Sequence, residues 1–137
     1  LLLGSKAEAP ICKKIYDHIL EKNPHWQKRL INSAGNTSLR SLIEITPRLS
    51  LLISNDSSPQ HFASAFNTPV ISIFGPTTPQ MGFAPTSTDQ KIIETKENLS
   101  CQPCSLHGPQ VCPKKHFLCM KTISVSDVFE AAKKILS

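Results

Sequence analysis

The sequence predicts an α/β fold built on a doubly wound parallel β-sheet, with helices covering both faces. Two observations predict it. Short apolar runs that suit buried strands alternate along the chain with amphipathic runs that suit helices. In addition, residues 51–74 have the pattern of a strand, a helix and a second strand, the unit in which a helix connects two parallel strands.

The first predicted elements are a strand and a helix. Residues 1–3 are an apolar run that Gly4 ends, and apolar residues at helical spacing predict a helix over residues 10–21, just before Pro24. Cys12 lies on this helix and is interpreted as a small buried apolar residue. The residues that we expect to face the core are Ile11, Ile15, Ile19 and Leu20.

A second strand and a second helix are expected next. Residues 30–33 suit a short strand and residues 34–37 a turn. Thr37 or Ser38 is the expected N-cap of a helix that ends near Pro47, because these side chains accept hydrogen bonds from the first free N–H groups of a helix. The residues expected to face the core here are Leu39, Leu42, Ile43 and Ile45.

The unit at residues 51–74 carries the predicted site. Its first strand ends at Ser54, a polar cluster at residues 55–58 suits an N-cap, and Pro59 suits the first turn of a helix. A second strand is expected at residues 70–74. The helix should begin at the carboxyl edge of the sheet, where its free N–H groups and its dipole can hold an anion. The residues of this helix expected to face the core are Phe62, Ala63, Ala65 and Phe66.

The rest of the chain predicts a loop, a strand and a terminal helix. The stretch at residues 75–89, rich in proline and glycine, suits a surface loop at the same edge of the sheet. Residues 91–95 suit a strand and residues 126–136 an amphipathic helix. The residues of this helix expected to face the core are Val128, Phe129, Ala132, Ile135 and Leu136.

Length, composition and charge limit the class of protein. With 137 residues, 39% of them hydrophobic, the chain is long enough for one domain with its own core. It lacks an initiator Met and a signal-peptide pattern, so we expect a fragment of a longer protein. No apolar run approaches the ~20 residues of a membrane helix. The net charge of +5 is scattered, and with one Trp and one Tyr it favours a phosphate-bearing ligand over nucleic acid.

Four cysteines follow the last predicted strand, at Cys101, Cys104, Cys112 and Cys119. Four thiols that include one Cys-x-x-Cys pair make a structural zinc site one interpretation. A standard zinc knuckle has two such pairs, so reduced structural thiols or an adventitious disulfide are the alternatives. We assign no metal ligands on this pattern.

Several motifs occur in an order that resembles a known family. They are Gly4-x-x-x-Glu8, AGNTSL at residues 34–39, SNDSSPQHFASAFNTPVISIFGPTTP at residues 54–79, and then CQPC and VCPKKHFLCM. Together they resemble the C-terminal half of the ADP-heptose:lipopolysaccharide heptosyltransferases, most closely the heptosyltransferase II branch. The resemblance implies a Rossmann-like domain of a GT-B glycosyltransferase, the nucleotide-sugar-binding domain, over residues 1–137, without the N-terminal acceptor domain.

The resemblance implies a diphosphate site at the start of the helix that follows Asp56. In the family pattern D-[ST]-G-x-x-H, backbone N–H groups of the turn hold the diphosphate, and the donors here would be those of Ser57, Ser58 and Gln60. Asp56 would fix the turn, and His61 would point toward the phosphates. Ser58 replaces the glycine of the family, a change that strains the turn only if the position needs φ > 0 or very close phosphate approach.

Other residues match positions that the family uses. Glu8 matches the position that contacts the ribose, Thr37 and Ser38 fall where the adenine edge is held, and Gly75 and Thr77 would line the cleft near the transferred sugar. The residue types alone also allow structural roles: Asp, Ser and Thr cap helices, a glutamate in a first turn follows the helix dipole, and a histidine can be structural.

The resemblance implies inverting transfer of a heptose from ADP-heptose to a hydroxyl of the lipopolysaccharide inner core, in the cytoplasm or at the inner face of the inner membrane. The catalytic base of the family is an Asp of the N-terminal domain, so we expect this chain to bind the donor without turnover and to need no cofactor. Two alternatives are a transferase with another sugar nucleotide, and a non-catalytic module with a zinc-bound loop that docks on phosphates of nucleic acid or a membrane.

Overall fold

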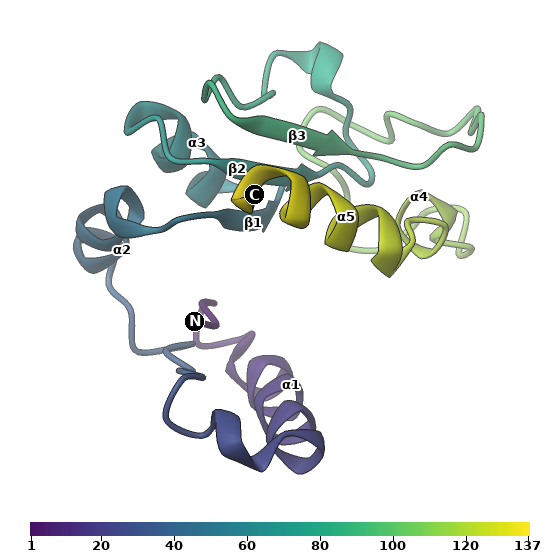
Figure 1. Ribbon diagram of the computed structural model, residues 1–137. Coiled ribbons are helices and arrows are strands. Elements are labelled where there is room, and N and C mark those ends of the chain that lie inside the picture. Colours follow the sequence, from purple (N-terminus) through teal and green to yellow (C-terminus); the bar gives the residue numbers. More distant parts are fainter. The chain divides into compact units, whose positions relative to one another are not determined.

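The computed structural model describes all 137 residues of the chain (Figure 1). They form two compact units, Leu1–Leu42 and Ile43–Ser137. The single domain expected over residues 1–137 stays a prediction. No helix of the chain combines the length and the apolar character that a membrane crossing requires.

The first unit contains helix α1 (Ala9–Lys22) and the 3-10 turn η1 (Pro24–Trp26). The strands predicted at residues 1–3 and 30–33 are parallel, but they pair through a single bridge between Leu2 and Asn32. The Leu2 N–H donates to the carbonyl of Ile31 at 2.8 Å, and the Ser33 N–H donates to the carbonyl of Leu2 at 2.9 Å. The two strands are therefore present only as a minimal parallel pair.

Helix α1 packs through Cys12 rather than through its isoleucines. Cys12 is buried, and its thiol lies 3.8 Å from the carbonyl oxygen of Leu3. A Cβ added at Gly4 would lie 3.2 Å from the Cys12 sulfur, so the helix approaches the backbone closely here. The prediction for Cys12 is confirmed. The prediction for Ile11 and Ile15 is wrong, because this approach leaves them on the outer side, 61% and 44% exposed.

Helix α2 (Leu39–Ile45) crosses from the first unit into the second. Ser38 is its cap, as predicted, because its hydroxyl accepts the N–H of Ser41 at 3.0 Å. Thr37 instead donates to the carbonyl of Ser33 at 3.0 Å. Leu39 is 63% exposed, so the prediction that it faces the core is wrong. A helix this short makes only about two turns and presents a narrow inner face.

The second unit is built on a three-stranded parallel sheet. Strands β1 (Leu52–Asn55), β2 (Val70–Ile73) and β3 (Gln90–Ile93) lie in the order β1-β2-β3. Helix α3 (Ser58–Ala65) connects β1 to β2 and packs on both, and helix α5 (Val125–Leu136) packs on β2 and β3. Figure 1 shows these two helices on different sides of the sheet. The predicted strand–helix–strand unit is confirmed.

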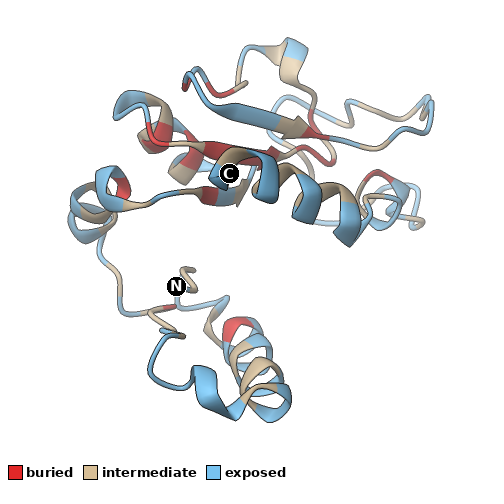
Figure 2. Cartoon of the chain, viewed as in Figure 1, coloured by how far each residue is buried: buried red, intermediate tan, exposed pale blue.

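Strand β2 lies at the centre of the core. Val70, Ile71 and Ser72 are fully buried, and the buried residues in Figure 2 concentrate on this strand and its flanks. Val70 also forms an apolar cluster with Leu52 of β1 and Ala63 of α3. A parallel strand that is covered on both faces is apolar almost throughout, which agrees with the sequence of β2.

The inner face of α3 differs from the prediction. Gln60 and Ala63 are buried, whereas Ala65 and Phe66 are exposed. The prediction for Ala65 and Phe66 is therefore wrong. The side-chain NH2 of Gln60 finds hydrogen-bond acceptors at this inner position, on Asp56 and on the carbonyl of Phe83, whereas its Oε1 is buried without a partner.

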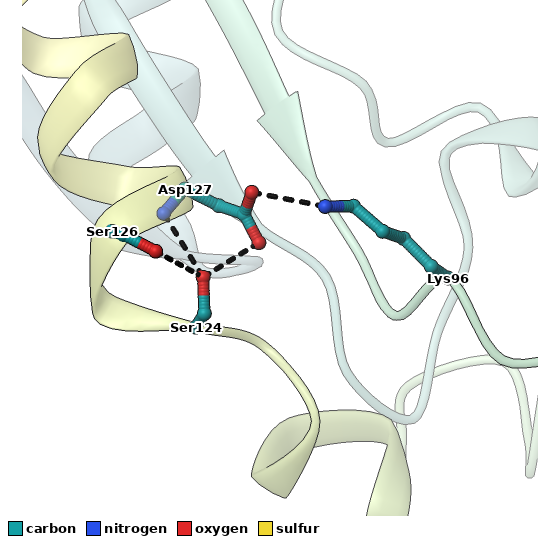
Figure 3. A network of polar contacts seen from close by, with 4 residues as sticks. All are labelled: Lys96, Ser124, Ser126 and Asp127. Carbon is teal, nitrogen blue, oxygen red and sulfur yellow. Dashed lines mark hydrogen bonds and ion pairs between the residues drawn. The ribbon is translucent and has the colours of Figure 1, made fainter.

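Helix α5 begins with a side-chain cap (Figure 3). The hydroxyl of Ser124 accepts the N–H of Asp127 at 3.0 Å and donates to the Asp127 carboxylate at 2.7 Å. Lys96 lies 3.0 Å from the other oxygen of the same carboxylate. The hydrogen bond from Ser124 is the main cause that lowers the pKa of Asp127, and Lys96 adds to it. The polar side chains at this helix start satisfy one another.

The outer side of α5 carries two apolar residues that were expected in the core. Phe129 is 60% exposed and Leu136 58% exposed, so these two predictions are wrong. The helix packs on β2 and β3. Its apolar stripe extends beyond the surface that these strands cover, so part of the stripe is exposed.

The segment between β2 and β3 is more buried than the predicted surface loop. It contains the 3-10 turn η3 (Pro79–Met81). The short helix α4 (Leu118–Lys121) packs over its start, and near its end the Thr86 N–H donates to the Ser64 hydroxyl of α3 at 3.0 Å. Because of this packing, the prediction of a surface loop is wrong at four buried positions, which are Gly75, Thr77, Pro85 and Ser87.

Candidate functional site

A cavity of about 220 Å³ opens where β1 and β2 end. The residues that line it from the strand ends and the following turns are Asn55, Asp56, Ile73, Gly75, Pro76 and Thr77. The remaining lining residues, from the C-terminal part of the chain, are His107, Phe117 and Met120. In open parallel sheets, ligands bind outside the carboxyl ends of the strands, and this cavity has that location.

Asp56 connects the two turns at this edge. Its carboxylate accepts a hydrogen bond from Gln60 Nε2 at 2.6 Å and another from Thr77 Oγ1 at 2.6 Å. Gln60 Nε2 also donates to the carbonyl of Phe83 at 3.1 Å. Hydrogen bonds to a charged group contribute about 1.5–3 kcal/mol each. The start of α3 is therefore held firmly against the loop that follows β2.

The first turn of α3 leaves backbone N–H groups open. Ser57 is the N-cap residue, with φ −161° and ψ 172°, but its side chain does not cap the helix. Its hydroxyl donates instead to the carbonyl of Asn55 at 3.2 Å. The N–H of Gln60, a predicted phosphate donor, bonds to the carbonyl of Ser57 at 3.2 Å. The N–H groups of Ser57 and Ser58 have no acceptor in the chain.

Ser58 fits its position without strain. The non-glycine residues with positive φ are Asn67, Lys115 and Phe117, and Ser58 is not among them. As the first residue of α3, Ser58 has the ordinary backbone of a helix N-terminus. The loss of the family's glycine therefore does not strain this turn.

The predicted residues of the second unit divide into two groups. Asp56, Gly75 and Thr77 meet at the cavity. Ser57, Ser58 and His61 are exposed and do not line it. They lie on the turn and the first part of α3, which Asp56 holds in place.

The predicted residues of the first unit make local hydrogen bonds. Glu8 precedes α1, and its carboxylate accepts hydrogen bonds from the Ser5 N–H at 2.7 Å and the Ser5 hydroxyl at 2.6 Å. These bonds, the side-chain one first, lower the pKa of Glu8. Thr37 and Ser38 close the turn and cap α2, as described above. Each of the three has a structural role, and contact of any of them with a nucleotide remains a prediction.

The sequence did not point to three of the lining residues. His107 and Phe117 lie in irregular segments, and Met120 lies in the short helix α4. Gly75 lies against Met120, whose Cγ would be 2.9 Å from a Cβ at that position. A glycine directly after a buried strand is a weak signal of such close packing.

The cysteine-containing loop packs against the cavity wall. The N–H of Cys104 donates to the carbonyl of Pro76 at 2.8 Å, and Gln102 Nε2 donates to the carbonyl of Gly75 at 2.8 Å. Burial is the main cause that raises the pKa of Cys104, and the charges of Cys101 and Cys112 add to it. The thiols are thus neighbours.

All five cysteines are free thiols. No group of three or more His, Cys, Asp or Glu side chains in the chain is arranged to hold a metal ion. The zinc interpretation stays a hypothesis.

The fold and the site define an α/β structure with a cavity at the carboxyl edge of a parallel sheet. The chain belongs to glycosyltransferase family 9 (heptosyltransferase), whose family model matches residues 1–114. It is 33% identical to lipooligosaccharide heptosyltransferase 2 of Campylobacter jejuni over 99% of this chain and 40% of that protein. It is 30% identical to lipooligosaccharide heptosyltransferase 2 of Haemophilus influenzae over 67% of this chain and 25% of that protein.

Two solved structures have a similar fold. One is ADP-heptose lps heptosyltransferase II of Escherichia coli, with a TM-score of 0.68 and 23% identity over 98% of this chain and 35% of that one. The other is a glycosyl transferase of family 9 from Veillonella parvula, with a TM-score of 0.62, 21% identity and the same coverage. The resemblance to the heptosyltransferases and the α/β fold of part of a GT-B enzyme are confirmed. The chain spans 40% or less of the length of these proteins.

Proposed function

We propose that this chain is the nucleotide-sugar-binding part of a heptosyltransferase and that it binds ADP-heptose. Its relatives are named as heptosyltransferases of lipooligosaccharide, and the family membership supports a sugar-nucleotide donor. The observation that carries the proposal is the turn at residues 56–58. There Asp56 is held by two hydrogen bonds while the N–H groups of Ser57 and Ser58 stay open.

The turn suits a diphosphate for an electrostatic reason. The N-terminus of a helix carries a partial positive charge, and open N–H groups there donate to phosphate oxygens. During transfer the bond between the anomeric carbon and the diphosphate breaks, and negative charge develops on the departing ADP. N–H groups that are already in position stabilise that charge without reorganisation.

The proposal extends to the complete reaction. The acceptor is a hydroxyl of the lipopolysaccharide inner core, transfer inverts the anomeric centre, and the reaction takes place in the cytoplasm or at the inner face of the inner membrane. A carboxylate base on the N-terminal domain of the family deprotonates the acceptor. No residue of this chain matches that base, so the chain alone binds the donor without turnover.

The open N–H of Ser58 offers a direct test. Proline is accepted at the first helical position and has no N–H, so Ser58→Pro removes the donor, whereas Ser58→Ala retains it. We expect ADP affinity, measured by calorimetry on the chain, to fall about tenfold or more in Ser58→Pro, the effect of one charge-assisted hydrogen bond. Ser58→Ala should bind like the unchanged chain.

Other ligands decide between the alternatives. Equal binding of UDP and ADP would favour a different sugar-nucleotide donor. Binding of duplex DNA with a steep salt dependence, together with indifference to ADP, would favour the non-catalytic phosphate-binding module and contradict the proposal. Equal ADP affinity in Ser58→Pro and Ser58→Ala would contradict the role of the turn.

A further inference from the structure

His107 lines the cavity from a distant part of the sequence. The cavity also contains Asp56 and Thr77, which come from the turns after β1 and β2, whereas His107 follows β3 and the Cys101–Cys104 loop. Neither the helical pattern nor the family motif includes this histidine. Its place at the cavity follows from the packing of an irregular segment.

The His107 side chain is exposed, and the backbone beside it packs against the residues of the cavity. The next residue, Gly108, has φ +70°, and a Cβ there would lie 2.8 Å from Pro76 Cγ, so the chain beside His107 packs directly on the cavity wall. On another side, the His107 ring lies 6.1 Å from the ring of Phe83, centroid to centroid, at an interplanar angle of 42°. The Phe83 carbonyl accepts a hydrogen bond from Gln60. Phe83 therefore lies beside the His107 ring and also accepts a hydrogen bond from Gln60, which holds Asp56.

Two of the residues that line the cavity can carry a charge, and these charges indicate the kind of ligand that suits His107. Among the lining residues, His107 is the one side chain that can carry a positive charge, and Asp56 is the one that carries a negative charge. The Asp56 carboxylate already accepts two hydrogen bonds at 2.6 Å. An imidazole N–H donates to a phosphate oxygen in the neutral ring and more strongly in the charged ring.

We propose that His107 is a donor-binding residue that contacts the diphosphate of the nucleotide sugar, from a segment other than the α3 turn. The inference rests on the proposed function, because it needs a nucleotide diphosphate at this edge of the sheet. In this role His107 binds the diphosphate of the donor and stabilises its negative charge when it leaves.

Two substitutions separate this role from a structural one. His107→Phe keeps a ring against Phe83 but has no N–H, whereas His107→Gln loses the ring but keeps an N–H donor. We expect His107→Phe to weaken ADP binding about tenfold, and His107→Gln to retain most of the affinity. Adenosine, which has no phosphate, should bind both variants like the unchanged chain.

The outcomes distinguish the inference from the function on which it rests. If the unchanged chain binds ADP and His107→Phe binds it equally well, the His107 inference is overturned and the proposed function stands. Weakening in His107→Gln alone would show that the ring acts by packing, which also overturns the inference. If the unchanged chain does not bind ADP, both fail.

Discussion

The two longer helices of the sheet unit begin in different ways. At α5, Ser124 caps the helix and the carboxylate of Asp127 is paired with Ser124 and Lys96, so the polar side chains of the first turn are satisfied (Figure 3), while the N–H groups of Val125 and Ser126 have no acceptor. At α3, Ser57 occupies the cap position without capping, and two N–H groups stay open. The two helix starts therefore differ in their side chains: the first turn of α5 carries its own carboxylate, Asp127, whereas the first turn of α3 has no acidic residue to face the partial positive charge of its helix.

The largest expected effect on the free energy of unfolding is that of a substitution at Asp56. The carboxylate of this residue holds the turn at the start of α3. Asp56→Ala removes two short hydrogen bonds and leaves the Thr77 hydroxyl and part of the buried Gln60 amide without an acceptor. We expect a loss of about 2–4 kcal/mol in the free energy of unfolding, measured with urea. A change below about 0.5 kcal/mol, the size of an ordinary surface substitution, would contradict the role of Asp56.

A smaller effect on stability is expected when the residue at the N-cap position of α5 or of α3 is replaced by alanine. Ser124→Ala should cost about 1 kcal/mol in the free energy of unfolding, because it deletes a real cap. Ser57→Ala should change it by less than about 0.5 kcal/mol, since the Ser57 hydroxyl makes no cap bond. The same urea titrations check both variants. Equal losses would remove the distinction between the two helix starts.

The smallest effect is the pH dependence of the α5 cap. The folded-state pKa of Asp127 is lowered from its ordinary value of 3.8, first by Ser124 and then by Lys96. Its contribution to stability is therefore present above the unfolded pKa and is lost as the pH falls through the folded pKa. The stability difference between the unchanged chain and Asp127→Asn should be constant near neutral pH and shrink below about pH 4. A difference that grows with acidification would contradict this assignment.

Local sequence signals were sufficient to predict the strand–helix–strand unit at residues 51–74. The polar cluster before Pro59 predicted the start of α3, and the apolar runs predicted β1 and β2, because turn chemistry and strand burial are expressed within a few residues. The family resemblance predicted Gly75 and Thr77 at the cleft, and they lie with Asp56 at the cavity because the ends of neighbouring parallel strands meet at one edge.

The positions that could not be predicted depend on tertiary packing. Ile11, Phe129 and Leu136 are apolar and at helical spacing, but which side of a helix is buried depends on what packs against it. His107 reaches the cavity through an irregular segment whose path follows from Gly108 and Phe83. No periodic pattern encodes that path.

The central claim is that the open N–H groups of Ser57 and Ser58 bind the diphosphate of the donor. The most direct measurement is the change in the backbone amide resonances of the ¹⁵N-labelled chain during titration with ADP and with adenosine. We predict large, saturable shifts of the Ser57 and Ser58 amides with ADP and small shifts with adenosine. Saturable ADP binding that leaves both amides unshifted would contradict the account.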